Sequence, residues 1–406
     1  MIAAWIAVAV LAGDDDLLIV DAPPEARSPW SWSLRTLALL GADLVAEPGE
    51  DTLATTLELA PALAFEPSPR WDARVRLRLR HRLGARPGAA RHDLDVDPLE
   101  ARVRWRPDGG PEVTLGWIDD TRWPELASPH PLDLALGPLP ASGEAGDRRR
   151  AIPALHLSHT LGPARVELLW QPLHVPMRVP LAGSDWAPFE VEGADELADL
   201  ARADGLGGGS AGARVRLRGA RWDLGLTWLW RPDPIPDASG ATRQHRVAAD
   251  LGATTGPLAW RLEVAGVDRH NGWTTARAPA HAAALEALVG VSSAPTIFLE
   301  LEVHLRLLHA LGAEGRWLGG GPRDLDLAGR VGLLLAWDGV LRLDVEGRVG
   351  LMRPDGDLAL ALALRASPRD EVALGLTIFE GAAVAAGRGA LYDADDALWV
   401  RWIRAW

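Results

Sequence analysis

The chain has 406 residues, enough for two or three soluble domains or for one large barrel. Its composition is 48% hydrophobic with a mean hydropathy of +0.00, and no apolar run beyond the N-terminus approaches the roughly 18–20 residues of a membrane helix, which excludes a helical membrane protein. The 0 cysteines exclude a disulfide framework and a thiolate metal site, and the net charge of −13 argues against nucleic acid as a partner.

The N-terminal segment is a short apolar block. Ile2–Ala12 is followed by Gly13 and then by three aspartates. This order is typical of the apolar core and small-residue cleavage site of a secretory signal. We therefore expect residues 1–13 to be a signal peptide and residues 14–406 to form the mature domain. Because the usual positively charged start is missing, a buried strand is the alternative for the first segment.

Polar and apolar residues alternate along the rest of the chain, many of the segments being roughly the 9–11 residues with which a tilted strand crosses a bilayer. Successive side chains of a strand point to opposite faces, so each segment would have an apolar and a polar face. The expected strands are 30–40, 53–65, 71–83, 98–106, 112–118, 152–160, 164–170, 213–218, 221–230, 244–253, 258–267, 283–291, 296–308, 324–336, 340–352, 357–366, 371–380 and 396–406. The alanine-rich segment 283–291 has a helical turn as its alternative.

The connections between these segments alternate between short turns and longer loops. The longer ones are 41–52, 84–97, 118–151, 171–212, 231–243, 268–281, 309–323 and 381–395. Outer-membrane barrels show this asymmetry, with tight periplasmic turns and long external loops. The sequence therefore predicts an all-β fold: a transmembrane antiparallel up-and-down β-barrel of about 18 strands, with 16 as the alternative. The most prominent external loops would be 118–151 and 171–212.

The positions of the tryptophans agree with this arrangement. In a membrane barrel an aromatic girdle lies at the membrane interfaces, near the strand ends. The alternative is that these tryptophans pack over the end of a β core, as they would in any β protein. The tryptophans at or near predicted strand ends are Trp71, Trp105, Trp117, Trp170, Trp230 and Trp337.

The segment Trp71–Leu83 fixes which face of the barrel meets water. Five arginines alternate there with mostly apolar residues. An arginine on the lipid face near mid-bilayer costs about 2–4 kcal/mol, so five would cost roughly 10–20 kcal/mol. The arginine face must line the lumen, and the same pattern recurs in two later segments. The predicted lumen-lining, solute-binding residues are Arg74, Arg76, Arg78, Arg80, Arg82, Arg102, Arg104, Arg214 and Arg216, together with Glu300 and Glu302.

Side-by-side like charges need counter-charge or water. If adjacent strands align, Arg76–Arg80 and Arg102–Arg104 would form one cationic patch. The loop 171–212 carries six carboxylates and could fold into the lumen to face this patch, which would narrow the pore. Alternatively, the loop stays outside and the arginines are simply solvated.

One spacing suggests chemistry in place of transport. His156 and Ser158 lie on one face of a predicted strand, as in the His-x-Ser of outer-membrane lipid hydrolases, where the histidine activates the serine. Those families have an Asn after the serine, whereas His159 follows here, and Leu155 and Leu157 claim the lipid face. We therefore predict a polar lumen-lining pair, no enzymatic activity, no metal site and no cofactor.

Several segments resemble a porin-type bacterial outer-membrane barrel, and more narrowly a large, poorly characterised family of such barrels. They are Asp97-Pro-Leu-Glu-Ala-Arg-Val-Arg-Trp, Ile152-Pro-Ala-Leu-His, Trp170-Gln-Pro-Leu-His-Val-Pro-Met-Arg-Val-Pro, Phe379-Glu-Gly and Leu391-Tyr-Asp-Ala-Asp-Asp-Ala-Leu-Trp-Val. The last resembles a closing hairpin in which an Asn-Asp pair is usual and Asp395-Asp396 stands instead. Leu398, Val400, Trp402 and Trp406 also resemble the closing strand that the barrel-assembly machinery recognises, although Arg404 interrupts their face.

Together these observations predict a channel in the bacterial outer membrane that passes or exports small, anionic solutes through an arginine-lined lumen. Its partners would be outer-membrane lipids, a small polar or anionic solute and the barrel-assembly machinery. Two alternatives remain: a lipid hydrolase using His156 and Ser158, and a structural or lipid-trafficking barrel that conducts nothing. The sequence does not indicate the solute, the oligomeric state or any periplasmic partner.

Overall fold

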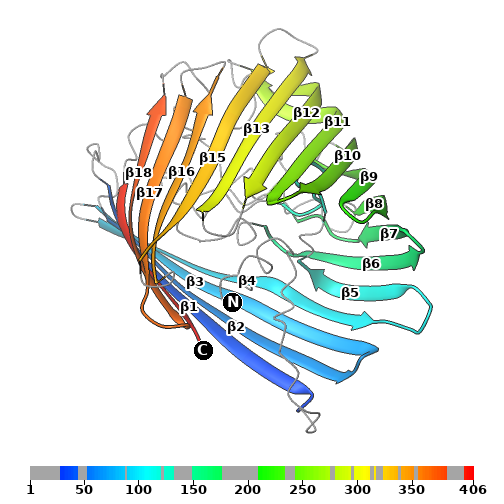
Figure 1. Cartoon of the computed structure of the whole chain (residues 1–406), viewed down its shortest axis with the longest axis horizontal. Helices are drawn as coiled ribbons and strands as arrows, with labels where there is room; N and C mark the ends of the chain where they lie inside the picture. The colour runs from blue at the N-terminus through cyan, green and yellow to red at the C-terminus, as the bar shows by residue number, and fades with distance from the viewer. Residues whose placement is uncertain are drawn as a thin grey trace.

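The computed structural model describes residues 28–43, 53–86, 89–119, 123–131, 149–175, 209–233, 243–274, 279–293, 297–310, 315–316, 323–336, 340–351, 355–381 and 397–406. Almost all of these residues form one large antiparallel sheet (Figure 1). Among them, no helix is long and apolar enough to cross a bilayer. The predicted signal peptide, residues 1–13, lies outside the described residues.

The strands are long and follow one another in chain order. They are β1 (Trp30–Asp43), β2 (Leu53–Ser68), β3 (Trp71–Arg86), β4 (Ala89–Trp105), β5 (Glu112–Ile118), β6 (Ile152–Leu161), β7 (Ala164–Gln171), β8 (Ser210–Arg218), β9 (Trp222–Pro232), β10 (Arg243–Thr255), β11 (Leu258–Thr274), β12 (Pro279–Ser293), β13 (Ile297–Ala310), β14 (Gly315–Arg316), β15 (Arg323–Ala336), β16 (Leu341–Gly350), β17 (Asp355–Arg365), β18 (Asp370–Gly381) and β19 (Ala397–Ala405). A short 3₁₀ helix, η1 (Glu125–Ala127), lies between β5 and β6.

The pairing follows the up-and-down order of a barrel. Each strand pairs with the next one along the chain, except that β13 pairs with β15 and the two-residue β14 pairs with β11. At the ends of the chain β19 pairs with β1, from Asp43 opposite Ala397 to Arg35 opposite Ala405. In the described part of the chain the pairing thus passes through eighteen strands and returns to the first. The predicted fold class and strand number are confirmed, and the segment 283–291 is a strand, β12.

The short turns join strands with little irregular chain. Leu161 pairs with Ala164 and Thr255 pairs with Leu258, so each of these hairpins has a two-residue loop of glycine and proline. Gly162 and Gly256 both have a φ of 59°, a value that suits glycine. A glycine with positive φ followed by proline fits the type II′ turn, whose twist matches that of the flanking strands.

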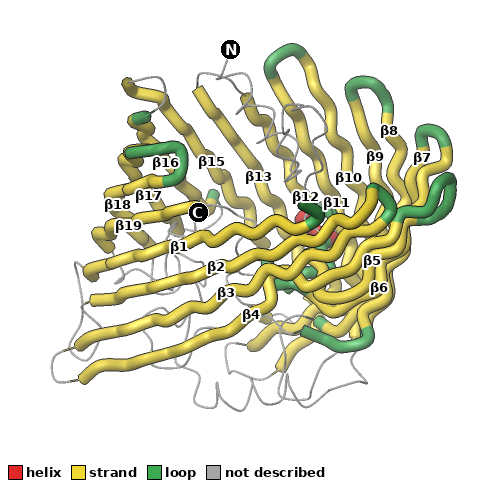
Figure 2. Tube along the Cα trace, turned by 90° about the horizontal axis from the view of Figure 1, so that it is seen from below, coloured by secondary structure: helices red, strands yellow, loops and turns green. Residues whose placement is uncertain are grey.

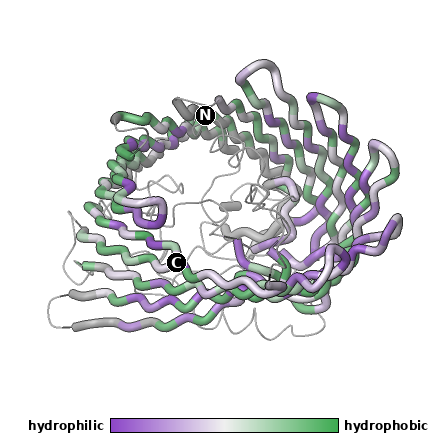
Figure 3. Tube along the Cα trace, turned by 60° about the horizontal axis from the view of Figure 1, so that its bottom comes forward, coloured by the Kyte–Doolittle hydropathy of each residue, from purple (hydrophilic) through white to green (hydrophobic). Residues whose placement is uncertain are grey.

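Side chains alternate between the two faces of the wall, and hydropathy alternates along the tube with them (Figure 3). In β3 the apolar Val75 is exposed, whereas Arg78 and Arg80 are buried. In β9 the apolar Leu226 is exposed and Thr227 is buried. A wall that exposes leucine and valine outward and buries charge inward is suited to a lipid surround.

Aromatic residues mark the short-turn end of the outer face. Trp71 at the start of β3 and Trp105 at the end of β4 lie with ring centroids 5.9 Å apart, and both are exposed. Trp222 and Trp260, at the starts of β9 and β11, are also exposed. Their position agrees with a girdle at a membrane interface. Trp337, part of the predicted girdle, lies outside the described residues.

The closing strand β19 presents the residues that the sequence placed on one face. Leu398, Val400 and Trp402 are exposed on the outer face. Arg404 interrupts this row only at the end of the strand, where its guanidinium carbon lies 3.9 Å from the ring centroid of Trp406. A guanidinium at the rim can stay hydrated while its stem covers apolar surface, so it need not enter the hydrocarbon layer.

The depth dependence of the outer face can be tested on β9. We expect Leu226→Arg to destabilise the folded barrel by about 2–4 kcal/mol, because it places a charge mid-wall, and Trp222→Arg at the rim of the same strand to cost about 0–1 kcal/mol. Denaturant unfolding of the barrel in lipid vesicles measures both. Equal costs for the two variants would contradict the assignment of the outer face to lipid.

Candidate functional site

The inner face of β3 carries the five arginines that the sequence singled out. Arg78 and Arg80 are buried, and Arg74, Arg76 and Arg82 are partly exposed. All five lie on the face opposite Val75, as the alternation predicts. Each forms an ion pair with a carboxylate: Arg74 with Glu100 at 3.7 Å, Arg76 with Asp119 at 2.8 Å, Arg78 with Asp97 at 3.2 Å, Arg80 with Glu58 at 3.4 Å and Arg82 with Asp95 at 2.7 Å.

Four of these counter-charges come from the neighbouring strands β2 and β4, and the fifth, Asp119, directly follows β5. Arg78 lies opposite Asp97 and Arg80 lies opposite Asp95 in the register of β3 with β4. Only Arg74 lies opposite an arginine, Arg102. The predicted cationic patch of Arg76–Arg80 with Arg102–Arg104 is therefore wrong: the acidic half of β4 faces most of the β3 arginines.

Two arginines at the end of β4, Arg102 and Arg104, and Arg106 directly after it converge on one carboxylate. Asp72 of β3 accepts hydrogen bonds from Arg102, from Arg104 at 2.7 Å and from Arg106 at 2.6 Å. Arg102 also bonds Glu100. A buried carboxylate that accepts from three guanidinium groups fixes their orientation, because each bond is charge-assisted.

In many of these ion pairs the guanidinium group is the more exposed partner and lies nearer the lumen, while the carboxylate lies beneath it, closer to the wall. The side chain of Arg74 is 36% exposed and that of its partner Glu100 is 7% exposed. The pattern recurs on β7, where Arg165 is 30% exposed over Glu167 at 3%, and on β11, where Arg261 is 39% exposed over Glu263 at 3%. Arginine has the longer side chain, so it extends past the carboxylate into the interior. The surface that a solute would meet at these positions is cationic.

A second charged cluster lies on the inner faces of β6 to β10. Glu167 is within 3.9 Å of His156 Nε2 and 3.8 Å of Arg214, which also pairs with Asp250 at 3.0 Å. Arg216, near the short-turn end of β8, pairs with Asp223. The predicted residues Arg214 and Arg216 are thus on the inner face, again with acidic partners.

Ser158 belongs to the same inner surface. Its hydroxyl oxygen accepts a hydrogen bond from Arg165 at 3.0 Å, and both Ser158 and His156 are buried on the inner face. A hydrolase acting on membrane lipid needs its serine on the outer face, so this placement favours the polar lumen-lining pair that the sequence predicted.

A segment between β5 and β6, residues 123–131, lies against the inner wall; we call it the inner segment. Leu126 N donates to Glu263 at 2.8 Å, the carbonyl of Leu126 accepts from Arg246, and the carbonyl of Ser128 accepts from Arg231 at 2.8 Å. Ala127 of η1 packs on two inward alanines of β10 and β11, Ala248 and Ala265. Two small residues on the wall leave room for the turn, and two arginines hold its backbone.

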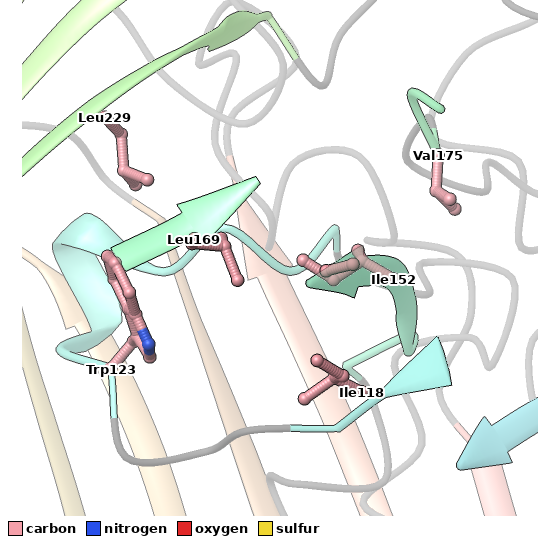
Figure 4. Packing of buried hydrophobic residues seen from close by; sticks show 7 residues of the cluster. Ile118, Trp123, Ile152, Leu169, Val175 and Leu229 are labelled. Carbon is pink, nitrogen blue, oxygen red and sulfur yellow. The ribbon is translucent and has the colours of Figure 1, made fainter. Parts of the chain in front are cut away.

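The inner segment begins with an apolar anchor. Trp123 is buried in a cluster with Ile118, Ile152, Leu169 and Leu229, drawn from four strands (Figure 4). Val175, just after β7, packs into the same cluster. A buried apolar cluster is unusual on an inner face that is otherwise charged. Through Trp123 and Val175 it attaches the described ends of the loops 118–151 and 171–212 to the interior.

The sequence left open whether the loop 171–212 narrows the pore or stays outside. The structure places residues 123–131 of the loop 118–151 inside, together with Val175 at the start of the loop 171–212. Residues 176–208 lie outside the described residues, so the predicted lumenal fold of the loop 171–212 stays untested. The sequence reasoning missed Trp123, Arg231, Arg246 and Glu263. A tryptophan within a loop was the available signal, whereas Arg231 and Arg246 are single arginines outside any alternating row of the kind seen in β3.

Across the barrel, the inner faces of β15 to β19 form a small recess of about 50 Å³. Its lining includes Arg330, Arg342, Arg401, Asp344, Glu346 and Trp399. Trp399 lies flat over Gly375, where a Cβ atom would overlap the indole, and donates to Thr377 Oγ1 at 3.1 Å. Arg401 pairs with Glu371 at 2.8 Å. The recess thus combines fixed guanidinium groups with the ring of a tryptophan.

The two acidic residues predicted to line the lumen belong to β13. Glu300 lies opposite Arg330, and Glu302 lies opposite Ala328 in the register with β15. Their side chains lie outside the described part of the structure, so their role stays a prediction.

Comparison with solved structures identifies the fold. No family model and no curated protein matches the chain. It is similar to Pseudomonas aeruginosa OpdK with vanillate (11% identity, 93% of this chain and 98% of that one, TM-score 0.54), to Pseudomonas aeruginosa OccD3 (10%, 93% and 91%, 0.56) and to Acinetobacter baumannii OccAB1 (10%, 93% and 96%, 0.56). These neighbours are outer-membrane porins. The chain therefore has the fold of a porin-type outer-membrane β-barrel.

The anchoring of the inner segment can be tested at Arg246. We expect Arg246→Met to remove the hydrogen bond to the carbonyl of Leu126 and the 2.8 Å ion pair with Glu286, at a cost of roughly 1–3 kcal/mol. Amide hydrogen exchange should become faster over residues 124–131.

Arg243→Met is the matched control. Arg243 is on the same strand, but its guanidinium carbon lies 4.0 Å from the ring centroid of Trp230 and it contacts Gly209 in place of the inner segment. Equal exchange in both variants would show that Arg246 does not hold the inner segment.

Proposed function

We propose that this protein is an outer-membrane channel that passes small solutes and prefers anionic ones. The observation that carries the proposal is the layering of the inner wall, in which partly exposed guanidinium groups lie over buried carboxylates. An anion diffusing through the lumen meets the exposed guanidinium groups first, so the carboxylates beneath them act mainly to hold the arginines in position. Preorganised guanidinium groups can then bind a carboxylate or phosphate with little loss of side-chain entropy.

The mixed charge of the wall makes the preference moderate. The described arginines of β3, β4 and β8 named above all have acidic partners, so the net charge of the wall is far smaller than its number of arginines suggests. A passing anion would share an exposed guanidinium group with the carboxylate that already holds it, since displacing that buried carboxylate would leave its charge unpaired. Weak, repeated binding of this kind allows a solute to enter and also to leave.

The inner segment supports a constricted pore independently of the loop 171–212, whose fold into the lumen stays a prediction. Its backbone lies on the inner faces of β9 to β11, with Arg231, Arg246 and Glu263 as anchors. A turn held at this position would reduce the free cross-section. The partly exposed guanidinium groups of Arg165 on β7 and Arg261 on β11 lie on the same inner wall as the inner segment.

The named neighbours favour the same class of solute. One is recorded with vanillate, and Pseudomonas aeruginosa OccK2, 11% identical over 93% of this chain and 97% of that one with a TM-score of 0.52, is recorded with glucuronate. Both compounds are carboxylates. The recess beside Trp399, with Arg342 and Arg401, offers a ring face and guanidinium groups for such a solute.

Export to the outer membrane and assembly there complete the proposal. Residues 1–13 would direct export, and the outward row of Leu398, Val400 and Trp402 would be the surface that the barrel-assembly machinery recognises. The hydrolase alternative is not favoured, because Ser158 is buried on the inner face and bonded to Arg165.

Reversal potentials in asymmetric KCl across planar bilayers test the charge preference. We expect the double variant Arg74→Gln, Arg76→Gln to shift permeability several-fold toward cations, because it removes two partly exposed positive charges from the lumenal surface while the carboxylates of Glu100 and Asp119 stay in place.

Arg404→Gln is the control, since it removes a positive charge at the outer rim, away from the lumen. An unchanged reversal potential in the double variant would contradict the anion preference. Absence of conductance in the wild-type protein would instead favour the non-conducting barrel.

A further inference from the structure

Two histidines lie together on the outer face of the β3–β4 hairpin. His81 of β3 lies opposite Leu94, and His92 of β4 lies opposite Leu83, so the histidines are diagonal neighbours across the strands. They share their face with Leu94 and Val96, which are exposed, and they alternate with the inward Arg80 and Arg82. A pair of imidazoles in a row of aliphatic residues is not explained by the lining of the lumen.

The separation of the two facing nitrogens is that of two ligands of one metal ion. His81 Nε2 and His92 Nδ1 are 3.3 Å apart, and the ring centroids are 5.5 Å apart with an interplanar angle of 27°. Zinc binds imidazole nitrogens at about 2.0–2.1 Å with tetrahedral angles, which places two ligand nitrogens roughly 3.3–3.4 Å apart. The rings therefore need little movement to accept an ion between them.

The position of the pair leaves it open to water. β3 ends at Arg86 and β4 begins at Ala89, so both histidines lie near the end of the hairpin opposite the short turns. In Figure 2 the ends of β1 to β4 lie side by side, and this part of the hairpin belongs to the ends opposite the short turns. His92 is exposed. An ion could enter from the aqueous side and complete its coordination with water molecules.

The hairpin would benefit from such a link. β4 pairs with β5 only over Ala101–Trp105, and among the described residues its first half, 89–100, pairs with β3 alone. Within the described part of the chain, one edge of this half of the strand is therefore not paired with another strand. A metal ion held by one residue of each strand would pin β4 to β3 at that edge, and it would stabilise the folded hairpin by mass action because the unfolded chain has no preformed site.

We propose that His81 Nε2 and His92 Nδ1 form a bidentate site for a divalent transition-metal ion of the Zn²⁺ or Cu²⁺ type on the outer wall. Imidazole with a free ring nitrogen suits these ions. In the hydrogen-bonded pair one of the two facing nitrogens carries a proton. On metal binding that ring carries its proton on the other nitrogen, through exchange with water, so that His81 Nε2 and His92 Nδ1 each supply a lone pair to the ion. The hydrogen bond between the rings is thereby exchanged for two metal–nitrogen bonds.

Metal binding to the untagged full-length protein in detergent, stripped beforehand with a chelator, tests the proposal. In calorimetric titration with Zn²⁺ we expect one site per chain that His81→Ala or His92→Ala weakens by more than about tenfold. Zn²⁺ should also raise the thermal midpoint of the wild type but not that of either variant. His245→Ala is the control. This imidazole is also on the outer face, but it stacks on the ring of Trp228, with 6.1 Å between the ring centroids. Its loss should leave the affinity for Zn²⁺ unchanged.

A second measurement stands on the wild type alone, in case the variants fold poorly. One equivalent of Cu²⁺ should give an electron paramagnetic resonance spectrum whose hyperfine structure requires two nitrogen ligands. A one-nitrogen spectrum would overturn the proposal. So would Zn²⁺ binding that is no stronger in the wild type than in the His81→Ala, His92→Ala double variant, and the pair would then be a hydrogen bond only.

Discussion

A guanidinium group facing acyl chains near mid-bilayer costs about 2–4 kcal/mol, and the arrangement of this barrel follows from that cost. The arginines of β3 can be accommodated only on the inner face, which commits Val75 and its aliphatic neighbours to the outer face. Because the alternation has a period of two, the same choice is then imposed on every paired strand. The return of the pairing from β19 to β1 leaves an interior that must hold charge and an exterior that must not.

The charges inside are organised as pairs, and their main contribution is geometric. Burying an ion pair such as Arg78 with Asp97 adds little net stability, because desolvation offsets the attraction between the charges. A slip of one residue between β3 and β4, however, would turn these arginines toward lipid and separate them from their carboxylates. The pairs therefore specify the register, and they hold the guanidinium groups in positions where a solute can meet them.

Much of the fold could be predicted from the sequence, because strand alternation and turn chemistry are local. Gly162 and Gly256 before proline mark their turns, and the alternation of Arg74 to Arg82 fixes the inner face. The acidic partners were missed for a physical reason. Asp95 and Asp97 alternate with Val96 and its neighbours, but so much negative charge resembles a solvated loop, and the predicted strand began only at residue 98. In the structure β4 extends well beyond that point and uses these carboxylates to neutralise β3.

The inner segment could not be predicted from local signals. Its anchors, Arg231 and Arg246, are about one hundred residues away in the sequence and bind backbone carbonyls, which every loop possesses. Nothing in residues 123–131 distinguishes a loop that turns inward from one that stays outside, apart from Trp123. The docking depends on small residues of two distant strands, Ala248 and Ala265, that happen to leave space on the wall.

Single-channel recording with the purified wild-type protein in a planar lipid bilayer tests the central claim most directly. A charged, water-filled interior enclosed by an apolar wall predicts that the protein needs detergent to stay in solution and inserts into the bilayer. It should then give discrete conductance steps, with a reversal potential in asymmetric salt that indicates anion selectivity. A protein that remains monomeric in buffer without detergent, or that produces no steps after insertion, would contradict it.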